Sequence, residues 1–220
     1  MMKVIKFINA IFFLFFFSKG FAQVQTELII DSGIVSKRGV YKTFDDFRFN
    51  SPLYDSIGFT VKEEETPYGG ILEREYLTTY EIVLDNPESM TRKDSVWGFC
   101  DGVSVYRAHE THKYKDGLRF YKFIKLGRYC IFNRIYLRNH KATPGIAPEL
   151  VYFVLNINNG GERELTSFVA SEILKRDPVL FKEYKKGRNA LLLETIDRNL
   201  EHRTEYIIKY SQEHSEEIKR

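Results

Sequence analysis

Leu150-Val151-Tyr152-Phe153-Val154-Leu155 is the stretch on which the fold depends, because each of its positions is apolar or aromatic. A strand with one face in water alternates apolar and polar residues, whereas a strand without alternation is covered on both faces. Turn-forming residues follow it, at Asn158-Asn159-Gly160-Gly161. We therefore expect a strand near the centre of a sheet, with helices or a second layer over it.

The chain before this strand has the period near two residues that is typical of β-structure. The pattern extends from Ile57 to Ile157, and its clearest instance is the alternation at Tyr76, Thr78, Tyr80, Ile82 and Leu84. The connections between the expected strands are short, which favours an antiparallel sheet.

Two hairpins are expected within this region. Asp101-Gly102 is a strong signal for a type I′ turn between two strands. Gly127 separates a second pair of strands in the same way. The strands expected on either side of these turns are Val96–Cys100, Val103–Tyr106, Arg119–Leu126 and Arg128–Leu137.

A short helix is expected before the strands. Thr43 is a candidate N-cap, and Asp46 at the third helical position approximates a capping box, with Asp in place of the usual Glu or Gln. Phe44 and Phe47 then share one face. Ser51-Pro52 ends the helix, because the residue before a proline avoids the α region.

The pattern becomes helical after Gly161. Leu165-Thr166 leads into a helix that extends to Leu174, and Asp177-Pro178 starts a second one, with Asp as N-cap and Pro at the first position. This second helix, over Val179–Lys185, is expected to be short and to stop near Gly187.

A long amphipathic helix is expected from Asn189 to about Glu213. Its apolar stripe comprises Leu193, Ile196, Leu200, Ile207 and Tyr210. Its solvent side comprises Asp197, Glu201 and Glu205. Such a stripe needs a partner surface, and the second face of the Leu150–Leu155 strand is the natural candidate.

Together these patterns predict an α+β fold, with a mainly antiparallel sheet of about six to eight strands followed by C-terminal helices. A strongly curled sheet is the alternative, because so many consecutive strands have edges to cover. The predicted divisions are a signal peptide over residues 1–22, an α+β domain over 23–187 and a long C-terminal helix over 188–220 with a frayed charged end.

The N-terminus has the pattern of a secretory signal peptide. Lys3 and Lys6 accompany an apolar run from Ile8 to Phe17, and small residues lie one and three positions before the expected cut. The run is about half of the ~20 residues that a membrane-spanning helix needs. We therefore expect cleavage between Ala22 and Gln23, and export across the inner membrane to a periplasmic or extracellular location.

The charge balance argues against nucleic acid as a partner. The chain has 33 Lys and Arg against 30 Asp and Glu, and three of these lysines, at positions 3, 6 and 19, lie in the predicted signal peptide. Their removal leaves a mature net charge of zero, without the basic excess that nucleic-acid binding needs. No second apolar stretch approaches spanning length, so we also expect no transmembrane anchor in the mature chain.

Cys100 and Cys130 are the two cysteines of the chain. In an oxidising compartment they permit a disulfide, provided that their strands are neighbours and their Cα atoms lie roughly 4.4–6.8 Å apart. The alternative is two small buried hydrophobic residues, since free cysteine is often found in the core.

His109-Glu110-Thr111-His112 resembles a zinc motif but departs from it. A zincin needs HExxH on a helix, and here the second His comes one position too early. We interpret the segment as a polar hairpin loop and predict neither a metal nor a cofactor.

Trp97 and Asp101 are the other candidates for chemistry. A carboxylate beside an indole in a cleft can have a raised pKa and serve as an acid. The alternative, which we favour, is a buried Trp beside a hairpin in which Asp101 makes the turn.

Four parts of the chain resemble a group of secreted bacterial proteins of unknown function. Gly39–Pro52 resembles GxYxTFxDFxxNxP, and Trp97–Tyr106 resembles WGFxDGxxxY. Leu126–Phe132 resembles xGRYxxF, and the tail from Asp177 to Tyr210 resembles DPxL…YIxKY. The resemblance implies a shared fold and carries no activity, cofactor or catalytic residue.

Two classes of function remain. The first is a non-catalytic secreted or cell-envelope protein that binds or organises an envelope protein or ligand. The second is a secreted hydrolase with an unrecognised active site. We favour the first, because the sequence offers no convergent set of acid, base and nucleophile.

Overall fold

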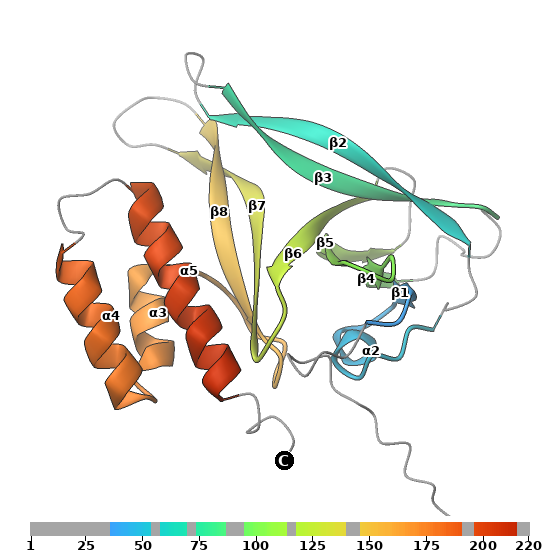
Figure 1. The fold of residues 1–220 in the computed structure, drawn as a ribbon. Helices are drawn as coiled ribbons and strands as arrows, with labels where there is room; N and C mark the ends of the chain where they lie inside the picture. The colour runs from blue at the N-terminus through green and yellow to red at the C-terminus, as the bar shows by residue number, and fades with distance from the viewer. Residues whose placement is uncertain are drawn as a thin grey trace, which may run out of the picture.

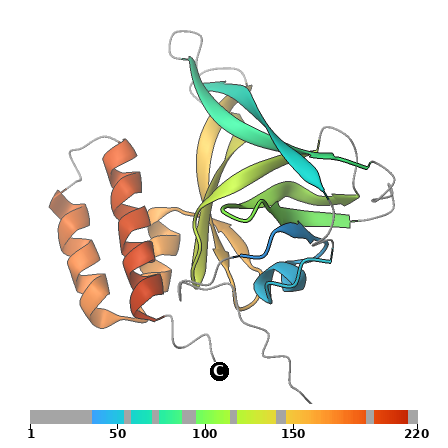
Figure 2. The same ribbon diagram turned by 45° about the vertical axis from the view of Figure 1, so that its right-hand side comes forward.

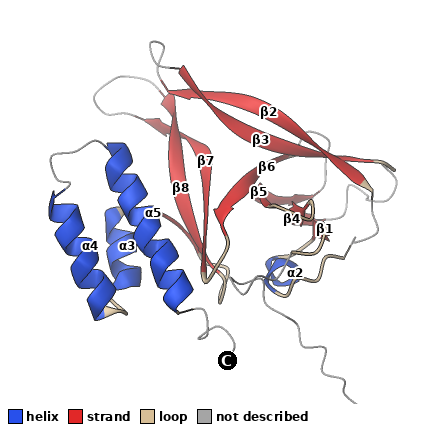
Figure 3. Cartoon of the chain, in the orientation of Figure 1, coloured by secondary structure: helices blue, strands red, loops and turns tan. Residues whose placement is uncertain are grey.

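The computed structural model describes residues 36–53, 58–69, 74–86, 95–113, 118–139, 146–190 and 196–214. It confirms the α+β fold: an antiparallel sheet that is not closed, followed by C-terminal helices (Figure 1). The described part of the sheet has nine strands, rather than the six to eight expected. The three C-terminal helices are gathered on one side of the sheet, whereas the short helix α2 lies beside β1 (Figure 3).

The strands are β1 Gly39–Tyr41, β2 Phe59–Gly69, β3 Arg74–Leu84, β4 Ser95–Cys100, β5 Val105–Lys113, β6 Arg119–Lys125, β7 Tyr129–Asn139, β8 Ile146–Asn156 and β9 Glu162–Glu164. The helices are α2 Phe44–Arg48, α3 Ser167–Leu174, α4 Pro178–Ala190 and α5 Ile196–Glu213. None of the helices in the described ranges is long and apolar enough to cross a membrane.

The sheet branches at β6. Its main path is β1-β4-β5-β6-β7-β8-β9, and the long β2–β3 hairpin joins through a short pairing of β3 with the start of β6. At the other end of β6, Phe123 pairs with Phe132 of β7, and a register shift follows. The sheet bends strongly around this strand, so that β7 and β8 stand across from β4 and β5 (Figure 2).

Three clusters of buried side chains cover the two faces of the sheet. The inner core lies within the bend, the hairpin core lies between β2–β3 and β4–β6, and the helix core lies between β7–β8 and the C-terminal helices. The inner core comprises Tyr41, Phe47, Trp97, Cys100, Val105, Tyr121, Phe123, Cys130, Phe132, Val151, Phe153, Leu155 and Ile157. The hairpin core includes Val40, Phe59, Ile82, Leu84, Phe99, Tyr106 and Phe120. The helix core includes Tyr129, Ile131, Val154, Leu165, Leu174, Tyr184, Ile207 and Tyr210.

The prediction that Leu150–Leu155 is a strand covered on both faces is confirmed, but its expected place near the centre of the sheet was wrong, because only the three-residue β9 lies beyond β8. β8 pairs with β7 on one side and β9 on the other. Val151, Phe153 and Leu155 lie in the inner core, while Val154 lies in the helix core. Since both faces are covered, the strand gains nothing from polar residues on either face.

The short N-terminal helix also forms as predicted. Thr43 accepts a hydrogen bond from the backbone N–H of Asp46, whose carboxylate accepts one in return from the N–H of Thr43. The chain leaves the helix through Asn50, which has a φ of 48° and is buried. This left-handed conformation is one that Asn tolerates better than most residues.

The first predicted hairpin forms, but its turn type was wrong. Cys100 pairs with Val105, so the connection is Asp101–Ser104 rather than a two-residue type I′ turn. The Asp101 carboxylate accepts hydrogen bonds from the backbone N–H groups of Val103 (2.8 Å) and Ser104 (2.7 Å). Bonding to its own backbone is the mechanism by which Asp stabilises longer turns.

The second C-terminal helix was predicted to stop near Gly187, but α4 continues to Ala190. A Cβ atom at Gly187 would lie 2.4 Å from Cε1 of His202 on α5. The glycine therefore permits close approach of the two helices, and packing offsets its cost of roughly 1 kcal/mol within a helix.

The long helix was predicted to begin too early. Asn189 belongs to α4, and α5 is described from Ile196; Leu193 lies outside the described residues. Leu200 is half-buried, and the side chains of Ile196 and Asp197 lie outside the described ones. The predicted faces are confirmed from Glu201 onward. Ile207 and Tyr210 are buried in the helix core, and Glu201 and Glu205 are exposed. α5 packs against β7, while β8, the strand predicted as its partner, contributes Val154 to the helix core (Figure 1).

Candidate functional site

The zinc candidate lies in a strand and not in a loop, so that interpretation was wrong. β5 continues through His109-Glu110-Thr111-His112, and His112 pairs with Val96 of β4. A strand lacks the helical turn on which a zincin places its two histidines. The side chains of both histidines are outside the described ones. Among the side chains that are described, no three His, Cys, Asp or Glu gather to hold a metal ion.

Cys100 and Cys130 are free and buried, so the structure has the second of the two alternatives rather than a disulfide. Each thiol donates a hydrogen bond to a different backbone carbonyl: Cys100 to that of Ser36 at 3.6 Å and Cys130 to that of Gly127 at 3.2 Å. Burial raises the pKa of Cys100 to about 11. A thiol with so little thiolate is a poor nucleophile.

Asp101 is a turn residue and not a catalytic acid. Burial raises its pKa, but hydrogen bonds from the backbone of Ser104 and Val103 and from the hydroxyl of Tyr106 outweigh that effect and hold the pKa below its usual value. A carboxyl that is ionised at neutral pH cannot donate a proton. Trp97 is buried, as favoured, and stacks on Phe47 with ring centroids 4.6 Å apart.

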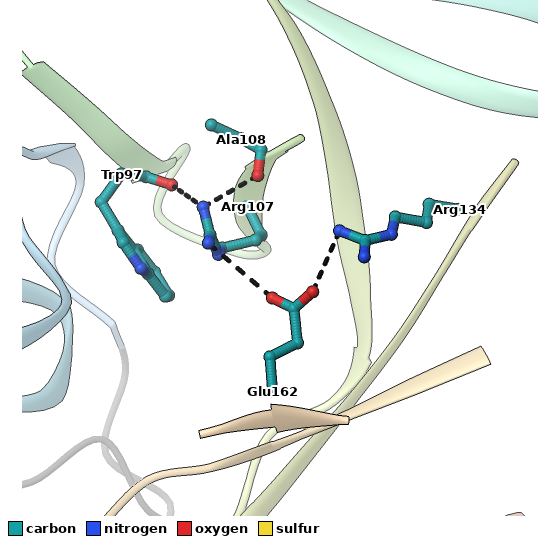
Figure 4. Close-up of polar contacts among 5 residues, drawn as sticks. All are labelled: Trp97, Arg107, Ala108, Arg134 and Glu162. Carbon is teal, nitrogen blue, oxygen red and sulfur yellow. Dashed lines mark hydrogen bonds and ion pairs between the residues drawn. The ribbon is translucent and has the colours of Figure 1, made fainter. Parts of the chain in front are cut away.

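The structure brings together three charged side chains that the sequence analysis did not single out. Arg107 of β5, Arg134 of β7 and Glu162 of β9 point toward one another on the inner face of the bent sheet (Figure 4). Nη1 of Arg134 lies 2.9 Å from Oε1 of Glu162, and Nη2 of Arg107 lies 3.7 Å from Oε2. We call these three residues the Arg–Glu–Arg cluster.

Aromatic rings support both arginines. The guanidinium of Arg107 lies 4.7 Å from the ring centroid of Trp97, and that of Arg134 lies 3.9 Å from Phe153. Both distances are in the range for cation–π attraction. The cluster thus forms the polar edge of the inner core.

The Arg–Glu–Arg cluster is largely removed from solvent. Side-chain exposure is 12% for Arg107, 14% for Arg134 and 20% for Glu162. Burial lowers the pKa of Arg107; Glu162 acts against this effect and Arg134 adds to it. An arginine nevertheless stays protonated in a protein, so both cations are permanent.

This arrangement is suited to holding an anion. Guanidinium groups donate hydrogen bonds and do not accept protons at neutral pH. General acid–base hydrolysis needs two groups in complementary protonation states, and the cluster contains one carboxylate. Two cations with aromatic support instead match the chemistry that proteins use for carboxylates and phosphates.

Sequence reasoning missed the cluster because its members come from strands that are not neighbours. β6 separates β5 from β7, and β8 separates β7 from β9. Arg107 stands opposite Tyr121, and Arg134 opposite Val151, both of which are inner-core residues. A charged residue at a position that pairs with buried residues is the signal by which each arginine could have been recognised. It could not have shown that the two arginines converge.

Comparisons with protein-family models, with curated proteins and with solved structures gave no match. The geometry of the described residues therefore carries the functional argument.

Proposed function

We propose that this chain is a non-catalytic binding protein of the secreted or cell-envelope class, which acts outside the cytoplasm after removal of residues 1–22. The N-terminal pattern of charged, apolar and small residues supports export. The Arg–Glu–Arg cluster supports binding rather than turnover, and it is the observation that carries the proposal.

Three features of the cluster favour binding. Its cations are permanent, so they hold an anion at any physiological pH. Its carboxylate is engaged by Arg134 at 2.9 Å and is not poised as a free base. Its arginines are fixed by strands and aromatic rings, and fixed groups bind with a smaller loss of entropy than mobile ones.

The first experiment tests export. The full-length chain is expressed in a bacterial host, and the exported protein is sequenced from its N-terminus. The expected first residue is Gln23, and mature material that retains the segment from Phe12 to Phe17 would contradict the export proposal.

The second experiment separates binding from hydrolysis. The exported protein is incubated with labelled peptidoglycan and with labelled envelope polysaccharide, and both the sediment and the soluble fragments are measured. We expect co-sedimentation without fragment release. Release that stops in Glu162→Gln, but continues in the exposed control Glu205→Gln, would instead establish the hydrolase alternative.

A further inference from the structure

We propose that the Nε/Nη2 edge of Arg107 is the binding site for an oxyanion, either a carboxylate or a phosphate group. The oxyanion lies against this edge, next to the Glu162 side chain. This inference rests on the proposed binding function and names the chemistry of its ligand.

The hydrogen-bond inventory of Arg107 carries the argument. A guanidinium has five N–H groups arranged in a planar fork. Nη1 donates to the carbonyl oxygens of Trp97 (3.2 Å) and Ala108 (2.8 Å), which uses both of its hydrogens (Figure 4). Nε is buried and has no hydrogen-bond partner. Nη2 faces Glu162 at 3.7 Å, which is an ion pair beyond hydrogen-bond distance.

The unused side of the fork is the one that binds oxyanions. Nε and Nη2 point in parallel, and this edge matches the two oxygens of a carboxylate or phosphate. A buried donor without an acceptor has lost its hydrogen bonds to water and has gained none in return. An oxyanion that fills the edge therefore recovers free energy that the folded chain leaves unrealised.

Glu162 shows how an anion is accommodated at this place. Its carboxylate already lies between the two arginines, but it is within hydrogen-bond distance of Arg134 and not of Arg107. β9, which carries it, is a three-residue strand that pairs only with β8 in the described sheet. The three side chains keep a residual exposure of 12–20%. Binding of a ligand at this edge therefore requires the Glu162 carboxylate to move away from Nη2 of Arg107.

The chain contains its own reporter for the test. Trp97 is the single tryptophan, and its ring lies 4.7 Å from the Arg107 guanidinium. Trp fluorescence of the exported protein is therefore followed while inorganic phosphate or acetate is added. Each titration is compared with chloride at equal ionic strength, because non-specific salt effects are then the same.

We expect a saturable change in fluorescence with at least one of the two anions and a non-saturable one with chloride. Saturation by phosphate alone identifies a phosphate-bearing ligand, and saturation by acetate a carboxylate-bearing one. Arg107→Lys loses the forked edge and should weaken binding by about tenfold or more. Arg119→Lys, at an exposed arginine paired with Glu64, is the matched control and should bind as the wild type does.

Glu162→Gln is the second variant, and it tests the oxyanion site even if Arg107→Lys fails to fold. Removing the competing carboxylate should tighten binding several-fold, since like charges repel at close range. The inference is overturned if neither anion saturates, if Arg107→Lys binds as the wild type does, or if Glu162→Gln leaves the affinity unchanged. If the protein fails these tests but still co-sediments with envelope polymer, the oxyanion site is refuted and the proposed function stands. If it binds neither the anions nor the polymer, the proposed function is refuted too.

Discussion

Replacing Trp97 by Ala tests the packing of the inner core most directly. The side chain is 4% exposed and contacts Phe47, Phe44 and Phe123, with ring centroids 4.6, 5.9 and 6.3 Å away. Truncation of a buried Trp to Ala costs about 3–5 kcal/mol. Loss of the ring beneath Arg107 adds to this cost, because a buried guanidinium then loses its cation–π partner.

The assay is thermal unfolding followed by circular dichroism, since the variant lacks the fluorescent residue. For a domain of this size each kcal/mol shifts the melting temperature by about 2–4 °C, so Trp97→Ala should melt about 6–20 °C lower than the wild type. Val103→Ala, at a side chain that is 92% exposed, is the control and should stay within about 0.5 kcal/mol. A Trp97→Ala protein that melts within 2 °C of wild type, on the order of the ~0.5 kcal/mol of a neutral surface change, would refute the burial argument.

Three further predictions concern other parts of the fold. Asn50→Ala should lower the urea midpoint more than Asn50→Gly. Both variants lose the side-chain hydrogen bonds from Lys37 (2.8 Å) and Tyr41 (3.3 Å), but Gly adopts the left-handed φ of 48° without strain; equal midpoints would contradict the backbone part of the argument. The pKa of Asp101 is lower in the folded chain than its usual value, so the stabilisation that its carboxylate provides is complete above about pH 4 and is lost as the pH falls through the folded pKa. The melting temperature of Asp101→Asn should therefore depend less on pH than that of the wild type in this acid range. A pH profile identical to that of the wild type would contradict this prediction. Ile207→Asp places a charge in the helix core and should unfold the domain, whereas the exposed control Glu205→Asp should not; hydrogen exchange checks this, and a sheet that stays protected while α5 alone opens would show that the helix is dispensable.

Much of the architecture follows from short-range patterns in the sequence. The capping box of Thr43 and Asp46, the uniform apolarity of Leu150–Leu155 and the Asp177-Pro178 helix start were all confirmed. Each depends on residues within a few positions of one another. The interaction that stabilises such an element is therefore present in the sequence itself.

The errors arose where a distant partner overrode a local preference. Gly187 favours a helix end locally, but the approach of His202 makes it a residue within α4. His109-Glu110-Thr111-His112 is polar enough for a loop, but β5 continues through it, and His112 pairs with Val96 of β4.

The sequence by itself determined that strands precede the C-terminal helices and where the capped helices begin, because hydrophobic periodicity and capping act over a few residues. Only the tertiary structure decided which side chains meet. The bend of the sheet at β6 brings Arg107 and Arg134 from separated strands to the single carboxylate of Glu162. Nothing local in the chain encodes that convergence, because it depends on strand order, register and curvature together. The candidate binding site is thus a product of the fold rather than of any motif.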